Sequence, residues 1–320
     1  MKVLRPISTM LLALLLAGCG GATALPTASP VASATRSVPT PTAPPTVPPA
    51  TPVPSPTVVD AHIEVGGLTR DYRVVVPPDV SAREPMPLLL VLHGAGQTIL
   101  DAESYGFDVP AMESGAVVVY PRGEKDPLFP HRPGWAWNAG AADTGVDDVA
   151  FIKALIERLK AEYAIDSRAI FILGASNGGQ MAYRAACELS DRIAAVGDIS
   201  GALLVDCHPS SPVSVIDVHG MADTMTPPAG GGEGCLPKEC PPLDDTQEAW
   251  RQVDGCTGDP TITTIAPDSV ETEWAACDDG TAVAFIRAGH TNHFMHGLQF
   301  DFPSVTWAFL KDHPRPAGAG

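Results

Sequence analysis

A three-layer α/β fold with a mostly parallel central sheet is predicted by the pattern of apolar residues beyond residue 57. Short runs rich in Val, Ile and Leu alternate there with longer amphipathic segments, as strands and helices do when helices cover both faces of a parallel sheet. Several runs are apolar at every position, which is typical of strands buried on both faces. The seven predicted strands span residues 72–76, 88–92, 116–120, 169–173, 194–199, 213–218 and 282–287.

Three helices are predicted between and after these strands. They span residues 147–165, 180–189 and 304–311. The first carries one apolar stripe at helical spacing, with Asp147 or Asp148 as its N-cap, and Ser304 is the expected cap of the third. The sequence contains no internal repeat, so these elements are assigned to one domain over residues 58–315, followed by a tail over residues 316–320.

Length and charge exclude several classes of function. The chain has 320 residues, which is enough to bury a sizeable core, and a formal net charge of −17. All 37 acidic residues lie beyond residue 57. Such a domain lacks the basic face that binds nucleic acid or anionic lipid. The sequence also has no run of 18 apolar residues, so it predicts no transmembrane helix.

The first residues have the pattern of an export signal. Lys2 and Arg5 precede a short apolar run, which is typical of a secretory signal peptide over residues 1–18. The run ends in Leu-Ala-Gly-Cys, which resembles the bacterial lipobox, in which the cysteine (here Cys19) is lipidated. An ordinary signal peptide cleaved after a small residue is the alternative.

A stalk is predicted over residues 19–57. Within residues 23–57 there are 11 Pro and 8 Thr, and Arg36 is the only charged residue. A segment of this composition cannot bury a core and favours extended polyproline geometry. We therefore expect an extracytoplasmic domain that is lipid-anchored to the bacterial cell envelope or secreted, in an oxidising compartment.

The candidate nucleophile is Ser176. The sequence Gly-Ala-Ser-Asn-Gly over residues 174–178 follows a predicted strand and precedes a predicted helix. A G-x-S-x-G motif in this context is the strand–turn–helix junction at which α/β hydrolases expose their nucleophile. Small flanking residues are needed because the turn is strained and tightly packed, and the helix N-terminus favours developing negative charge.

The oxyanion hole is predicted to use the backbone N–H groups of Ala95 and Asn177. Ala95 lies in the His-Gly-Ala-Gly sequence that follows the strand over residues 88–92, where these hydrolases place the second donor. His93 precedes the nucleophile in the chain, so we expect a structural turn residue beside the substrate cleft rather than the general base.

The acid and the base should follow the nucleophile in the order Ser, Asp, His. Asp223 lies on the loop past the strand over residues 213–218, at the same sheet edge as Ser176, and is the predicted acid. Asp217, inside that strand, and other loop acids are alternatives. His290 directly follows the last predicted strand and is the predicted base, with His293 as the alternative.

The same loop has histidines that suggest a metal site. His290, His293 and His296 are spaced three residues apart, but the loop lacks a helical Glu or a Cys partner, so neither a metal nor another cofactor is predicted. His313 lies in a Pro/Gly/Ala-rich tail and is not a candidate.

Together these motifs resemble the poly(3-hydroxybutyrate) depolymerase and feruloyl esterase family of α/β hydrolases. The resemblance covers roughly residues 60–315. It is carried by the sequences at 92–94, 120–123, 135–138, 146–152, 163–166, 174–179, 219–223, 227–231 and 289–290. It implies Ser176 as nucleophile, Asp223 as acid and His290 as base. One departure is that Asn292 and His293 stand where the family usually has Trp and Pro.

Six cysteines remain beyond Cys19, and an even number in an exported domain indicates disulfides, with fifteen possible pairings. Cys235–Cys240 is expected to close the Gly/Pro-rich insert over residues 230–243. Proximity and the habit of the family further imply Cys187–Cys207 and Cys256–Cys277. A zinc site is the alternative, but Cys235 and Cys240 have no matching second pair.

The sequence therefore predicts an extracytoplasmic serine carboxylic ester hydrolase that works through an acyl-enzyme. Its substrate would be a polyester or an ester on a plant polysaccharide, and Trp135 and Trp137 could stack on a sugar or phenolic ring or simply pack. His293 is also placed in the cleft. We expect a monomer that meets the membrane only through its anchor and binds no nucleic acid. The alternatives are a serine peptidase of the same fold and a non-catalytic, polymer-binding lipoprotein.

Overall fold

The computed structural model describes residues 55–78, 85–125 and 134–317. The predicted signal peptide, Cys19 and the stalk up to residue 54 lie outside these residues. No helix in the described part of the chain is both long enough and apolar enough to span a membrane.

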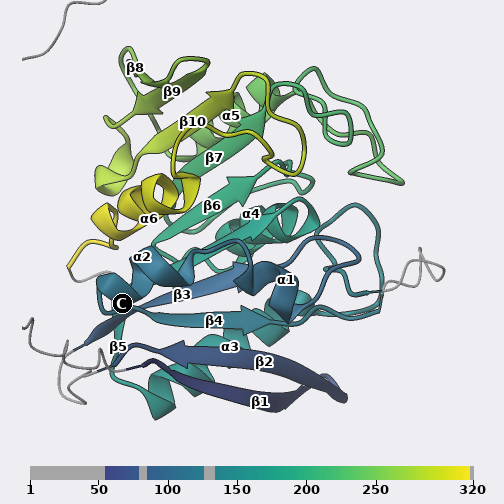
Figure 1. Cartoon of the computed structure of the whole chain (residues 1–320), viewed down its shortest axis with the longest axis vertical. Coiled ribbons are helices and arrows are strands. Elements are labelled where there is room, and N and C mark those ends of the chain that lie inside the picture. The colour runs from purple at the N-terminus through teal and green to yellow at the C-terminus, as the bar shows by residue number, and fades with distance from the viewer. Residues whose placement is uncertain (1–54, 79–84, 126–133, 318–320) are drawn as a thin grey trace, which may run out of the picture. The chain divides into compact units, whose positions relative to one another are not determined.

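A ten-stranded sheet forms the centre of the described domain, with the strand order β1-β2-β4-β3-β5-β6-β7-β10-β9-β8 (Figure 1). The strands are β1 (Thr57–Val65), β2 (Leu68–Val76), β3 (Met86–Leu92), β4 (Val117–Pro121), β5 (Ile165–Ala175), β6 (Ala195–Ile199), β7 (Ser214–Gly220), β8 (Thr261–Ala266), β9 (Ser269–Trp274) and β10 (Val283–Ala288). The six strands from β4 to β10 in this order pair in parallel, and antiparallel strands flank them at both edges. The predicted fold class is confirmed.

Helices cover both faces of this sheet (Figure 1). They are α1 (Ile99–Glu103), α2 (Asp108–Glu113), α3 (Asp148–Glu162), α4 (Asn177–Glu188), α5 (Leu243–Val253) and α6 (Phe302–Asp312). Side chains of α3, α4 and α5 form one core with one face of the sheet, and those of α1, α2 and α6 form a second core with the other face. This layering leaves the carboxyl ends of the parallel strands, where ligands bind in open α/β sheets, free to carry loops.

The seven predicted strands correspond to β2 to β7 and β10, whereas β1, β8 and β9 were not predicted. These three lie at or next to the sheet edges, and most of their residues are exposed or half-buried. They therefore lack the continuous apolar run that identifies a central strand. The short helices α1 and α2 and the polar helix α5 were missed for the same reason, because periodicity is weak in short or polar segments.

Two helix starts were predicted, and one of them was wrong. Asp147 caps α3, and its side chain accepts a hydrogen bond from the Ala150 amide. The third predicted helix is capped by Asp301 rather than Ser304, whose amide donates to the Asp301 side chain. Pro303 then occupies the first turn, where a missing N–H costs nothing.

The predicted disulfides Cys187–Cys207, Cys235–Cys240 and Cys256–Cys277 are all present. The first ties the end of α4 to the loop after β6, and the second closes the insert over residues 230–243. Of the three bonds, Cys235–Cys240 lies in the insert that also lines the site described next.

Candidate active site

Ser176 lies on the sharp turn between β5 and α4. Its φ angle is 55°, a left-handed conformation that non-glycine residues seldom adopt. The turn is held by a 2.7 Å hydrogen bond from the Ser176 amide to the Ile199 carbonyl. A Cβ on Gly178 would lie 2.5 Å from the Leu92 carbonyl oxygen, so only glycine fits there. The predicted turn is thus present, with the reason for its glycine visible in the packing.

A cavity of about 690 Å³ opens beside Ser176. This volume is in the range of small-molecule sites. Ala95 and Asn177, whose amides were predicted to bind an oxyanion, line the same cavity, as do Trp137 and His293. Residues far apart in the sequence therefore meet in one space.

Asp223 and His293 form a hydrogen-bonded pair at this cavity. The His293 Nδ1 lies 2.7 Å from the Asp223 Oδ2 and donates to it, because a carboxylate only accepts. The other carboxylate oxygen accepts from the amides of Met225 and Thr226 at 2.7 and 2.9 Å. Burial would raise the pKa of Asp223, but the bonds from His293 and the two amides outweigh it and lower that pKa. The carboxylate is therefore ionised at neutral pH.

The histidine that meets Asp223 is His293 and not the predicted His290. The His290 side chain is exposed, and its amide lies 3.3 Å from the Asp268 carboxylate at the start of β9. The chain then bends, and the Thr291 carbonyl accepts from the Ala222 amide at 2.9 Å, so the two loops run together. This contact lays the next residues of the loop over Asp223.

Of the three evenly spaced histidines of this loop, His293 pairs with Asp223, His296 lines the cavity and His290 does neither. Within the described residues these three do not form a group of donor atoms at metal-ligand spacing. Their even spacing in the sequence reflects a loop rather than one face of a helix.

His93 was expected beside the cleft but lies in the core. It is fully buried, and its Nδ1 donates to the Gly94 carbonyl while its Nε2 accepts from the Gly123 amide. Burial lowers the pKa of His93 to about 4, so the ring is neutral. Both ring nitrogens are occupied, which confirms a structural turn residue and removes His93 from the cleft.

Only one of the two tryptophans predicted for the cleft lines the cavity. Trp137 lines the cavity, and its backbone N–H donates to the Asn177 side chain at 2.7 Å. Trp135 does not line it and instead lies beneath the Arg122 guanidinium, 4.0 Å from the ring centroid. The loop is anchored by Asp148, which accepts from the Asn138 amide and from Arg70. Trp137 is therefore a cleft residue and Trp135 is not.

The insert over residues 230–243 supplies part of the cavity wall. Glu233, Gly234 and Leu236 line the cavity, and the Gln180 side chain of α4 donates to the Gly234 carbonyl at 2.9 Å. Phe294, next to His293, also lines it, and 60% of its surface is exposed. No motif in the sequence pointed to Glu233 or Phe294, since both belong to irregular loops.

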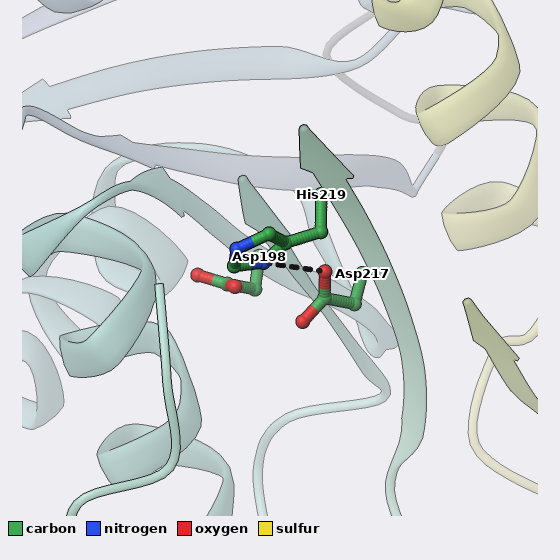
Figure 2. Close-up of side chains that lie close together, drawn as sticks. All are labelled: Asp198, Asp217 and His219. Carbon is green, nitrogen blue, oxygen red and sulfur yellow. Dashed lines mark ion pairs between the residues drawn. The ribbon is translucent and has the colours of Figure 1, made fainter. Parts of the chain in front are cut away.

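A second polar cluster lies in the core beneath the site. Asp198 of β6 and Asp217 and His219 of β7 are at most 1% exposed, and Figure 2 shows their side chains converging. Each offers one atom of the metal-ligand type, within 4.8 Å of the others. However, Asp217 already accepts from the Tyr183 hydroxyl at 2.7 Å and Asp198 from the Gly201 amide at 2.8 Å. These bonds make the cluster a hydrogen-bonded network, and we assign no metal to it.

Sequence and structure comparisons place the chain among esterases. Residues 70–229, half of the chain, match the family model described as esterase PHB depolymerase. The chain is 30% identical over 278 residues to NocK from Nocardia uniformis subsp. tsuyamanensis, with 79% of this chain and 78% of that protein covered. It is 27% identical over 267 residues to feruloyl esterase C of Emericella nidulans, with coverage of 80% and 88%.

Among solved structures, the fold resembles that of the acetyl xylan esterase from Aspergillus awamori. The TM-score is 0.58 at 15% identity, with 79% of this chain and 99% of that chain covered. At this identity the likeness concerns the fold, and it agrees with the three-layer architecture described above.

Proposed function

The chain belongs to the esterase PHB depolymerase family and is a carboxylic ester hydrolase, and from that premise we propose that it works as a serine esterase through an acyl-enzyme on Ser176. One observation carries the proposal. Ser176, on a strained turn, lines the same 690 Å³ cavity as His293, which is bonded to Asp223. This arrangement supports Ser176 as the nucleophile, His293 as the base and Asp223 as the acid that orients the base.

In the proposed reaction the Ser176 hydroxyl oxygen attacks the ester carbonyl carbon while His293 accepts the hydroxyl proton at Nε2. The Nδ1–H bond to Asp223 fixes the tautomer that leaves Nε2 free to accept. The amides of Ala95 and Asn177 stabilise the oxyanion of the tetrahedral intermediate. The alcohol leaves with the proton from His293, and water, deprotonated by His293, then hydrolyses the acyl-enzyme and regenerates the serine.

The substrate is proposed to be an ester with an aromatic or short acyl group. Trp137, Phe294 and Phe302 line the cavity, and such rings pack well against a phenolic or aliphatic group. The similarity to a feruloyl esterase supports the aromatic option, and the exposed Phe294 at the cavity suits a sugar ring of a polysaccharide. No lysine or arginine among the described residues lines the cavity, which favours a neutral ester over an anionic one.

We place the enzyme outside the cytoplasm. The three disulfides support an oxidising compartment. The lipobox-like sequence ending at Cys19 supports a lipid anchor, with residues 19–57 as the stalk that carries a monomeric catalytic domain.

The test is hydrolysis of p-nitrophenyl acetate by the oxidised protein and by Ser176→Ala. We expect the substitution to lower kcat/KM about 10³-fold or more, because the acyl-enzyme can no longer form. Ser211→Ala is the matched control, since Ser211 is half-buried like Ser176 but does not line the cavity, and should stay within about twofold of wild type.

Equal rates for wild type and Ser176→Ala would contradict the assignment of the nucleophile. Binding of a feruloylated polysaccharide without any turnover would favour the polymer-binding alternative. Hydrolysis of the corresponding p-nitroanilides, which are amides, at rates similar to those of the esters would instead favour a peptidase.

A further inference from the structure

A second histidine lies against the acid of the site. His219 is 1% exposed, and its Nε2 lies 2.8 Å from the Thr226 carbonyl oxygen and 3.7 Å from the Asp223 Oδ2. Its Nδ1 lies 3.6 Å from the Asp217 Oδ1. Figure 2 shows the ring beside the buried Asp217 carboxylate, and the distances place the Asp223 carboxylate near its Nε2.

The hydrogen bonds determine where protons must be. The Thr226 carbonyl can only accept, so the His219 Nε2 carries a hydrogen. The remaining nitrogen, Nδ1, and the Asp217 Oδ1 that faces it have no hydrogen-bond partner within the described residues. If both lacked a proton, two buried acceptors would face each other, at the cost of an unsatisfied pair. A proton between them removes this conflict, and when Nδ1 carries it His219 is an imidazolium beside an Asp217 carboxylate.

Asp198 completes the balance of charge. It is the Cα partner of Asp217 across the parallel strands β6 and β7, so the two carboxyl groups lie side by side on one face. Its Oδ1 has no partner within the described residues, and a proton there could be donated to Asp217. Burial, followed by the charge of Asp217, raises the pKa of Asp198 far above its usual value. The three groups are then neutral overall, with one positive charge placed next to Asp223.

We propose that His219 is a positioning residue of the esterase: a buried imidazolium, held by Asp217, that fixes the Asp223 carboxylate and sets the pH at which His293 is free as the base. This inference rests on the proposed roles of Asp223 and His293. A positive charge beside Asp223 keeps that buried carboxylate ionised. It also opposes protonation of His293, so the base is available at lower pH than Asp223 alone would permit.

The other groups around His219 do not change this assignment. Tyr183 of α4 donates to Asp217, and burial raises the pKa of Tyr183 well above 10, so it stays neutral. Arg287 of β10 is the Cα partner of His219, but its guanidinium binds Asp244 and Gln247 of α5. Burial acts to lower the pKa of His219, whereas the nearby Asp217 carboxylate raises it, and the net shift is upward.

The charge of His219 can be read directly from long-range ¹H–¹⁵N spectra of the full, oxidised protein. The two ring nitrogens of an imidazolium resonate close together, whereas those of a neutral ring are well separated. We expect an imidazolium signal that persists above pH 7 and is identified by its absence in His219→Gln. Asp198→Asn, which mimics a protonated acid, should keep this signal, and Asp217→Asn, its neighbour across the strands, should convert the ring to the neutral form.

The second readout is the acidic limb of the pH profile of kcat/KM for p-nitrophenyl acetate. His219→Gln keeps a donor for Thr226 but cannot be charged, so it should move this limb to higher pH by about one unit. Asp217→Asn should move the acidic limb in the same direction.

A neutral His219 in the wild-type spectrum would overturn the proposal, whatever the activity. So would one bound metal ion per chain that Asp217→Asn removes, or a His219→Gln enzyme with an unshifted limb. If the wild-type protein shows the imidazolium signal but hydrolyses no ester, the result counts against the proposed esterase function and not against the charge of His219.

Discussion

The pKa values of two buried aspartates of this protein are shifted in opposite directions. Asp223, after β7, accepts from His293 and from two backbone amides, and its pKa is lowered. Asp254, after α5, accepts one bond from the Val213 amide, and its other oxygen has no partner within the described residues. Burial raises the pKa of Asp254 to about 7. The difference shows that burial alone does not make a carboxylate functional: the number of donors aimed at it decides whether it stays charged.

The largest effect should come from removing the imidazole bound to Asp223. We expect His293→Ala to lower kcat/KM about 10⁴-fold, because the serine loses its general base. The variant would also remove the main group that lowers the pKa of Asp223 and make this residue resemble Asp254. His290→Ala is the matched control on the same loop and should stay within about twofold of wild type. If His290→Ala lowers kcat/KM more than His293→Ala does, His290 is the base instead.

A smaller loss should follow when the charge of Asp223 is removed but the side chain is kept. Asp223→Asn can still accept from Met225 and Thr226, but it no longer stabilises a positive charge on His293. We expect kcat to fall about 10³-fold with little change in KM, because the defect lies in the transition state. Steady-state kinetics on p-nitrophenyl acetate would separate the two constants, and a change confined to KM would contradict a catalytic role.

The contrast between the two aspartates also predicts how stability depends on pH. An aspartate whose folded pKa of about 7 exceeds the unfolded value of 3.8 stabilises the fold fully only below 3.8, and this contribution is lost as pH rises through 7. The loss amounts to about 4 kcal/mol in total, mostly between pH 4 and 7. Asp254→Asn stays neutral and should remove this dependence.

Urea unfolding at pH 5 and pH 8 would measure the effect of Asp254. The exposed Asp245 on α5 provides the control, since Asp245→Asn should leave the wild-type pH dependence unchanged. An equal pH dependence in wild type and Asp254→Asn would mean that Asp254 is already ionised in the fold.

Ser176 and its turn were predictable because their constraint is local. Gly174 and Gly178 contact each other across the turn, and the same short segment contains the strand end, the serine and the helix start. Although Leu92 and Ile199 also contact this turn, the motif itself lies within one short segment and can be read without knowing the rest of the fold. The central strands were predictable for a similar reason, since burial on both faces demands apolar residues at every position.

Which histidine meets Asp223 was not predictable at this level, because His290 and His293 differ by only three residues. Both follow β10, and the family pattern favours the first. The choice depends on the bend between them, which is fixed by the bond from the Ala222 amide to the Thr291 carbonyl across two separate loops. The unusual Asn-His pair at 292–293, where the family has Trp and Pro, was the one sequence signal of this change.

By itself, the sequence predicted the three-layer sheet, the serine turn, the place of Asp223 at the site and the cysteine pairs. Each follows from residues close in the chain or from the alternation of apolar runs, and the cysteine pairing also from resemblance. Only the tertiary structure decided that His293 meets Asp223, that His93 and Trp135 lie outside the cleft, and that His219 lies beside Asp223. These facts depend on how loops from different strands cross at one sheet edge. The path of such a loop is fixed by a few long-range hydrogen bonds, which leave no periodic pattern in the sequence.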